Sequence, residues 1–184
     1  MIGLDGKTLS SPRLTYSLLT GADAAALREI LSDPAVTEPA GFRVAVCDAA
    51  FEEFFAGLTA MDTGVGIRLD GTLIGYIHVY PERVEGTPFE GKTCVGFGFV
   101  IGKPWQGRGY GTEALVTLTE YMKSTAIPRP DGTRAPVDIC FADHFVGNEA
   151  SRRAILKAGY RYVETYDMYF EALGREMTCL SYAR

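Results

Sequence analysis

The spacing of apolar residues divides the chain into helical and strand-like segments. Apolar positions recur at the helical period of about 3.6 residues over 22–31 and 48–61. Asp70-Gly71 stands between two apolar runs and predicts a two-residue type I′ hairpin. Short β-branched, aromatic and alternating runs predict strands at 14–19, 65–69, 73–79, 95–101, 137–142, 160–170 and 177–182.

A glycine-rich loop separates the predicted strand at 95–101 from an amphipathic helix predicted over 112–122. The loop, Gln106-Gly107-Arg108-Gly109-Tyr110-Gly111, has glycine at alternate positions. Glycine readily adopts positive φ, so such a loop leaves N–H groups uncovered beside the positive end of the helix dipole. We expect the loop to bind an anion, most simply a diphosphate. A strand-to-helix turn without a ligand is the alternative.

A second segment has the features of a capped helix. Asn148 is a good N-cap residue, a helical run follows, and Gly159 is a typical helix stop. Alone, this segment indicates no chemistry.

Together the two segments resemble the GNAT superfamily of acyl-CoA-dependent N-acyltransferases. The family pattern Q/R-x-x-G-x-G/A matches Gln106, Gly109 and Gly111. The N-terminal third, with Arg13-Leu14 opening a strand, is similar to the RimJ/RimL-type branch, which acetylates protein N-termini and, in many relatives, small amines. The later family pattern N-x-x-S, helix, K-x-G-[FY] matches Asn148, Ser151, Lys157, Gly159 and Tyr160.

The resemblance implies an α+β fold, the GNAT fold. Its central, mostly antiparallel mixed sheet has about seven strands with about four helices, and a V-shaped splay separates the fourth strand (95–101) from the fifth (137–142). We expect one domain over residues 1–184, because this length suits a single core. The proline-containing segments 33–46 and 127–136 are expected to be loops.

The resemblance also implies acetyl-CoA as cosubstrate. The strand backbone at 99–101 would pair with the pantetheine arm, the loop amides and the Thr112 hydroxyl would bind the diphosphate, and Asn148 and Ser151 would face the arm near the thiol. The expected cofactor-binding residues are Phe99, Val100, Ile101, Gln106, Gly107, Arg108, Gly109, Tyr110, Gly111, Thr112, Asn148 and Ser151.

Both usual catalytic side chains of the family are missing. Gly96 stands at the position of the general-base Glu, and Ile155 stands at that of the general-acid Tyr. An α-amine, with a pKa of about 7.7 to 8.0, needs less help from a base than a lysine near 10.4. The remaining candidate proton acceptors are His144, Asp143 and His78.

We expect His144 to act as the base, directly or through water, and Ser151 to protonate the leaving thiolate. The alternatives are a packed His144 and a Ser151 that only supports the helix start. Residues Glu38, Phe42 and Arg43 are candidates for acceptor contacts.

The predicted function is transfer of acetyl from acetyl-CoA to a primary amine, by direct attack in a ternary complex. The amine belongs to a protein N-terminus or to a small molecule, and relatives are monomers or homodimers. The alternative is a non-catalytic acyl-CoA-binding module, since Gly96 and Ile155 replace the usual catalytic residues.

A competing motif lies at Gly86–Thr93, which fits the P-loop pattern G-x-x-x-x-G-K-[ST], and an apolar run ends at Asp143 as a Walker B strand would. A P-loop must open a helix to complete its phosphate nest. The residues after Thr93 predict a strand, so a hairpin tip is the better interpretation.

The amino-acid composition excludes several other classes of protein. A net charge of −5 argues against binding to nucleic acid. With no apolar run of membrane-spanning length and no signal-peptide pattern, we expect a cytoplasmic protein that does not bind membranes. Scattered cysteines and two distant histidines predict no metal site and no disulfides, only buried free thiols: Cys47, Cys94, Cys140 and Cys179.

Overall fold

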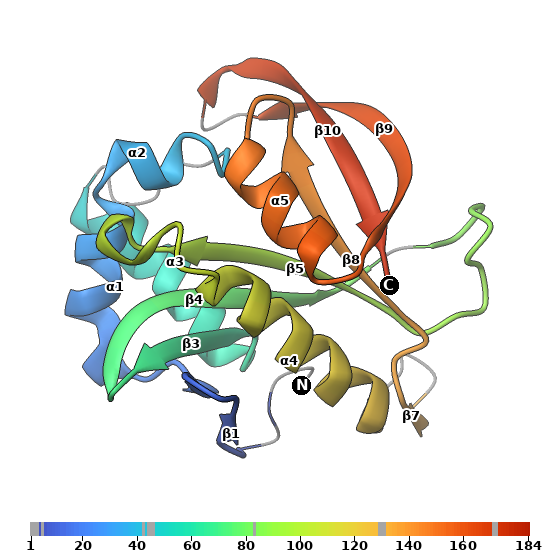
Figure 1. Cartoon of the computed structure of the whole chain (residues 1–184), viewed down its shortest axis with the longest axis horizontal. Helices are drawn as coiled ribbons and strands as arrows, with labels where there is room; N and C mark the ends of the chain where they lie inside the picture. Colours follow the sequence, from blue (N-terminus) through green and yellow to red (C-terminus); the bar gives the residue numbers. More distant parts are fainter. Residues whose placement is uncertain are drawn as a thin grey trace.

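An eight-stranded sheet forms the centre of the molecule (Figure 1). The computed structural model describes residues 4, 6–41, 43, 47–82, 84–128, 132–170 and 173–184. The strands, in their order across the sheet, are β1 (Leu9–Ser10), β2 (Thr15–Leu18), β3 (Gly64–Leu69), β4 (Thr72–Pro81), β5 (Cys94–Ile101), β8 (Ile139–Phe145), β10 (Arg175–Ala183) and β9 (Arg161–Phe170). All neighbours are antiparallel except β5 and β8.

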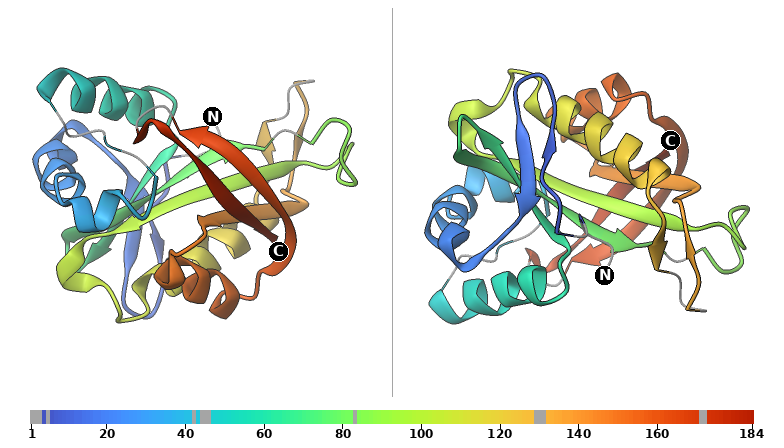
Figure 2. Two further views of the ribbon diagram at one scale, coloured as in Figure 1. Left: turned by 90° about the horizontal axis from the view of Figure 1, so that it is seen from above. Right: turned by 90° about the horizontal axis from the view of Figure 1, so that it is seen from below.

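Helices cover both faces of this sheet (Figure 2). They are α1 (Ala24–Leu31), α2 (Pro34–Thr37), α3 (Asp48–Ala60), α4 (Tyr110–Ser124) and α5 (Glu149–Lys157), with 3-10 turns η1 (Gly21–Asp23) and η2 (Lys103–Trp105). One core cluster joins the sheet to α4 and α5, and a second joins the other face to α1 and α3. Alternation along the strands assigns each side chain to one of these faces.

The parallel strands β5 and β8 separate at their carboxyl ends. Their pairing begins at Cys94 and Ile139 and ends at Phe97 and Ala142, although both strands continue beyond that point. The last residues of β5 therefore have a free edge toward β8. This divergence confirms the predicted splay and the predicted fold class.

The hairpin at Asp70-Gly71 is also confirmed. Both residues have positive φ, 49° and 81°, as a type I′ turn requires. The turn joins β3 directly to β4, and β4 in turn pairs in a fixed register with β5.

Two segments predicted as loops contain regular structure. Asp33 caps the short helix α2, because its Oδ1 accepts a hydrogen bond from Ala35 N at 2.9 Å. Strands β6 (Ile127–Pro128) and β7 (Arg134–Ala135) pair as a separate two-stranded ribbon. Within these two segments, residues 42, 44–46 and 129–131 lie outside the described residues.

The P-loop candidate Gly86–Thr93 forms turns at the tip of the long β4–β5 connection, which projects from the body of the molecule (Figure 1). Strand β5 follows immediately, so no helix completes a phosphate nest there. The interpretation as a hairpin tip is confirmed.

Three of the four thiols are buried, as expected, but Cys47 is exposed, because it precedes α3 as its N-cap residue. Within the described ranges, no helix combines the length and the apolar character that crossing a bilayer requires.

Candidate functional site

A cleft of about 1060 Å³ opens at the splay between β5 and β8. Strands β4, β5 and β8 and helices α2, α4 and α5 contribute to its walls. Most of the residues predicted to bind cofactor line it, and Arg108 is the exception. They are Phe99, Val100, Ile101, Gln106, Gly107, Gly109, Tyr110, Gly111, Thr112, Asn148 and Ser151.

The glycine loop forms one end of this cleft. Gly107 and Gly109 have φ of 76° and 84°, in the region that favours glycine. The expectation of positive φ at Gly111 is wrong, because α4 begins at Tyr110, two residues earlier than predicted, and includes Gly111. Gly111 serves close packing instead, since a Cβ there would lie 3.3 Å from the Phe99 ring.

The amides at this end point to an anion site. The first backbone hydrogen bond of α4 runs from Glu113 N to Gly109 O at 3.0 Å. Among the described residues, the N–H groups from Gly107 to Thr112 have no hydrogen-bond acceptor. Uncovered amides at the positive end of a helix dipole are suited to phosphate oxygens.

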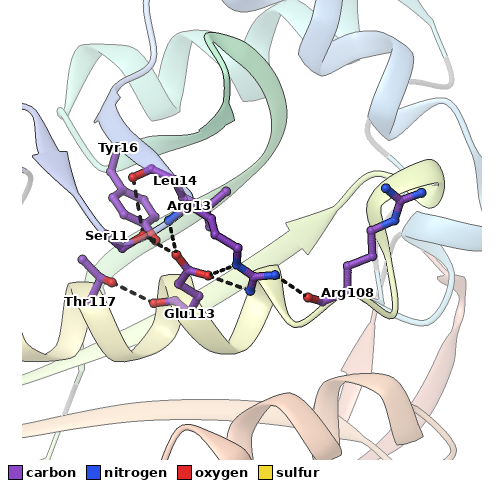
Figure 3. Close-up of polar contacts among 7 residues, drawn as sticks. All are labelled: Ser11, Arg13, Leu14, Tyr16, Arg108, Glu113 and Thr117. Atoms are coloured by element: carbon purple, nitrogen blue, oxygen red, sulfur yellow. Dashed lines mark hydrogen bonds and ion pairs between the residues drawn. The ribbon is translucent and has the colours of Figure 1, made fainter.

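Arg13, from the segment before β2, ties this loop to the sheet (Figure 3). Its guanidinium pairs with Glu113 at 2.7 Å, and its Nη1 donates to the Arg108 carbonyl at 3.0 Å. The same group lies 4.6 Å from the centre of the Tyr110 ring. Ser11 Oγ donates to the other oxygen of Glu113 at 2.6 Å. The loop conformation thus depends on a residue about a hundred positions away, a role that sequence reasoning missed.

Glu113 puts a negative charge in the first turn of α4. Burial alone would raise the pKa of this carboxyl, but the hydrogen bonds from Ser11 and Arg13 and the charge of Arg13 hold it below its ordinary value. The Arg13 cation therefore offsets a carboxylate that would repel a diphosphate. The Arg108 side chain points away from this pair (Figure 3).

The side chains of Gln106 and Thr112 hold the walls of the cleft. Gln106 Nε2 donates to Ile101 O at 2.8 Å, which occupies the carbonyl at the end of β5. Thr112 Oγ1 donates to Ala154 O in α5 at 3.4 Å. The side chains of Gln106 and Thr112 thus both have a hydrogen-bond partner in the protein.

Asn148 caps α5, as predicted. Its Oδ1 accepts from Ser151 N at 3.1 Å, while its Nδ2 donates to Pro39 O at 2.7 Å. It therefore joins the start of α5 to the segment after α2. The Ser151 hydroxyl has no hydrogen-bond partner among the described residues, and Ser151 lines the cleft.

The space above Gly96 is filled by neighbouring side chains. Gly96 is the cross-strand partner of Tyr80. A Cβ on Gly96 would lie 2.2 Å from Tyr80 Cε2 and 2.7 Å from Glu82 Oε2. A phenol ring and a carboxylate from β4 and the residue after it thus occupy the place where family members carry the general-base side chain. Ile155, at the other missing position, is fully buried in the core.

Asp143 lies on the same sheet face as Gly96, because Gly96 pairs with Phe141 and side chains alternate along β8. Its Oδ2 accepts a hydrogen bond from the Tyr166 hydroxyl at 2.7 Å. Its Oδ1 is buried and has no hydrogen-bond partner within the described structure. Burial and the Asp143 charge both raise the pKa of Tyr166 and of Tyr80, so both phenols are neutral.

His144 points to the opposite face. It is 5% exposed, and its ring stacks on Tyr182 with 5.3 Å between centroids. Its Nδ1 lies 2.9 Å from Phe145 O, and its Nε2 lies 3.1 Å from the Tyr182 hydroxyl. A carbonyl only accepts, so Nδ1 carries the proton and Nε2 accepts from Tyr182. Neither nitrogen of the predicted base is left to receive a proton from a substrate.

His78 lines the cleft on the Gly96 face, half-buried and 5.3 Å from the Tyr80 ring centre. Burial lowers its pKa, so the imidazole is neutral at pH 7. Glu38 lines a smaller neighbouring pocket of about 280 Å³ and pairs with Arg43 at 2.8 Å. The third predicted acceptor contact, Phe42, lies outside the described residues.

The chain belongs to the GNAT acetyltransferase family. Residues 13–161 match the family described as Acetyltransferase (GNAT) domain. This range includes the glycine loop, both walls of the splay and α5. No curated protein matches the sequence.

Solved structures share the fold at low identity. A GNAT-family acetyltransferase from Bacillus anthracis has a TM-score of 0.76 at 18% identity, covering 97% of this chain and 98% of its own. RimJ from Mycobacterium smegmatis, in complex with CoA-disulfide, has a TM-score of 0.73 at 18% identity, covering 98% and 88%. A ribosomal-protein-alanine N-acetyltransferase from Brucella melitensis has a TM-score of 0.67 at 21% identity, covering 92% and 98%. At such identities the fold is shared, and the RimJ/RimL branch stays a prediction.

Proposed function

We propose that the protein transfers acetyl from acetyl-CoA to a primary amine. The observation that carries the proposal is the cleft at the splay, with uncovered amides from Gly107 to Thr112 at one end and the free edge of β5 along one side. The amides suit the diphosphate. The β5 edge offers backbone groups to the pantetheine arm, as an unpaired strand edge offers them to a further strand. The CoA-disulfide complex of the structurally similar RimJ is consistent with this use.

The reaction requires positioning more than activation, because a thioester is already reactive. An ammonium acceptor first loses a proton. The neutral nitrogen then attacks the thioester carbonyl carbon, and the oxyanion that forms collapses as the C–S bond breaks. The nitrogen loses a second proton, and the CoA thiolate takes one up. The balance is an amide, CoA thiol and one released proton for each ammonium consumed.

Ser151 is the proposed donor to the thiolate, since it lines the cleft at the start of α5 with its hydroxyl unengaged among the described residues. For the proton acceptor, the geometry favours the Gly96 face of the sheet over His144. Asp143 and His78 both line the cleft on that face, whereas His144, which is also part of the lining, has both ring nitrogens hydrogen-bonded within the protein.

The acceptor is either a protein N-terminal amine, as in the RimJ/RimL-type branch, or a small-molecule amine. A non-catalytic acyl-CoA-binding module is the second candidate, and the observation in its favour is that Gly96 and Ile155 carry no catalytic group. The two candidates differ in whether an amine accelerates release of the thiol.

The experiment follows thiol release from acetyl-CoA by the full chain with a panel of N-terminal Ser and Ala peptides, polyamines, amino sugars and arylalkylamines. The proposed function predicts amine-dependent release and a matching acetylated product. Tight acetyl-CoA binding without release across the panel would instead support the binding module.

A further inference from the structure

We propose that Asp143 binds the ammonium group of the acceptor, and that this acceptor is a primary amine carried on an aromatic or compact apolar body. The inference rests on the proposed function and specifies the acceptor side of the same cleft. Three observations support it: the position of Asp143, its unpartnered oxygen, and the chemistry of the walls around it.

Asp143 lies where the acceptor must approach. It follows Ala142, the last β8 residue to pair with β5, so it marks the start of the splay. It faces the same side as Gly96 and Gly98, where the family places its general base. Asp143 is one of the residues that line the cleft.

The carboxylate has an unused acceptor. Tyr166 satisfies Oδ2 at 2.7 Å, but Oδ1 is buried without a hydrogen-bond partner among the described residues. A buried polar atom left unpaired is costly, and a buried charge more so. An ammonium group supplies both the missing donor and the opposite charge. The Tyr166 hydrogen bond fixes the carboxylate orientation in which such a group is received.

Aromatic rings form much of the wall of the cleft that contains this carboxylate. Phe54 packs edge-on to Tyr76 at 6.1 Å, and Phe145 packs edge-on to Phe170 at 4.7 Å. These four side chains and Tyr80 all line the cleft. Helix α2 and the residues after it add small apolar groups: Ala35, Val36, Pro39 and Ala40. Ring faces attract cations and bury apolar bodies, so this wall suits an ammonium on an aromatic or apolar carrier.

Most charged side chains of the cleft lining are separated along it, and the exception is Glu149 in α5, which pairs with Arg152 at 3.3 Å. The lysine and arginine side chains on its described lining are Lys103 in η2 and Arg153 and Lys157 in α5. Strands β4, β8 and β9, which carry Asp143 and several of the aromatic residues of the lining, contribute no lysine or arginine to the described lining. Cations at the end with the uncovered amides suit CoA phosphates, and the carboxylate with rings suits a cationic acceptor.

The test measures binding to the CoA-saturated protein, which cannot turn over. Wild type is titrated with benzylamine and phenethylamine, which are cations at pH 7, and with benzyl alcohol as the uncharged counterpart. The same titrations use Asp143→Asn and the control Asp167→Asn. Asp167 is exposed on β9 and accepts a bond from Thr178 at 2.6 Å, which an asparagine oxygen can still accept.

We expect wild type and Asp167→Asn to bind benzylamine at least about tenfold more tightly than benzyl alcohol. Asp143→Asn should abolish this preference and lower kcat/KM for the amine at least about thirtyfold. Its acetyl-CoA affinity should remain unchanged, which also shows that the variant is folded. Tyr166→Phe, which keeps the ring, should weaken amine binding by a smaller factor with acetyl-CoA affinity intact.

Two results would overturn the inference while leaving the proposed function intact. One is a wild-type protein that acetylates peptides or polyamines but neither binds nor acetylates the two arylalkylamines. The other is an Asp143→Asn protein that keeps the preference for benzylamine over benzyl alcohol. If no amine accelerates thiol release by the wild type, the proposed function fails, and the binding titration separately shows whether an ammonium site exists.

Discussion

The two ends of the cleft are fixed by different parts of the chain. The proposed donor end is mostly backbone: consecutive amides of the 107–112 loop, oriented by two glycines and the start of α4. The proposed acceptor end consists of side chains from strands far apart in sequence, where Asp143 meets Tyr166 and Tyr80 covers Gly96. A site made of local backbone tolerates little change in torsion angles. A site made of distant side chains changes with single substitutions, which suits a family with one donor and many acceptors.

The largest effect is expected at the donor end. Gly109→Val should weaken acetyl-CoA binding at least about a hundredfold, because a β-branched residue opposes φ of 84° and adds bulk at the amides. Isothermal titration measures this loss. Gly71→Val is the matched control, with φ of 81° in the open β3–β4 hairpin. It should lower thermal stability and leave acetyl-CoA affinity unchanged, and an equal loss of affinity in both variants would contradict the assignment of the loop.

At the acceptor end, Gly96→Ala should reduce amine kcat/KM about tenfold while acetyl-CoA affinity is kept. The new methyl group would occupy the position of the Tyr80 ring, and such overpacking costs about 1 to 3 kcal/mol of stability. Denaturant unfolding measures the cost. Gly98→Ala, on the same strand face but with open space at its Cβ, should cost less. In a Tyr80→Ala background only the contact with the flexible Glu82 carboxylate remains, so the penalty of Gly96→Ala should shrink, and an undiminished penalty would exclude the ring as the cause.

A smaller effect is expected from Arg13→Gln, which removes the ion pair with Glu113 and the bond to the Arg108 carbonyl. Because the Arg13 side chain is 46% exposed, we expect only about a fivefold loss of acetyl-CoA affinity, near 1 kcal/mol. Arg28→Gln is the control, since Arg28 also pairs with a carboxylate, Asp48, and lies over a ring, Phe51, away from the cleft. Unchanged affinity in Arg13→Gln would show that the loop holds its conformation without this residue.

The smallest effect on turnover is expected at His144. Since both ring nitrogens have partners in the protein, His144→Gln should change kcat less than about threefold while lowering the unfolding midpoint through lost packing on Tyr182. Steady-state rates with the best amine measure this. A loss of tenfold or more with intact stability would restore the sequence-based hypothesis that His144 is the base.

The sequence predicted the local geometry of the proposed donor end better than the side-chain contacts of the proposed acceptor end, and the reason is physical. Glycine spacing and helix capping act over a few residues, so the positive φ at Gly107 and Gly109 and the cap at Asn148 follow from local composition. The contact of Tyr80 with Gly96 depends on the register of β4 against β5, which no short pattern specifies. The same holds for the Asp143–Tyr166 bond, which links strands separated by β10 in the sheet.

The alternation of buried residues along β8 could have distinguished Asp143 from His144 already in the sequence. Cys140 and Ala142 are buried against the α4 side of the sheet, and side chains alternate along a strand. His144 therefore shares their face, and Asp143 takes the other. The two candidates are therefore distinguished by the sheet face that each residue of β8 occupies, and not by the usual chemistry of histidine.

We propose that one cleft binds acetyl-CoA at the 107–112 loop and an amine at Asp143. Two-substrate initial rates of thiol release, measured for wild type, Gly109→Val and Asp143→Asn, separate these two binding functions. We expect a rise in KM for acetyl-CoA alone in Gly109→Val and a rise in KM for the amine alone in Asp143→Asn. Rises in both constants in both variants, or no amine-dependent release by the wild type, would contradict it.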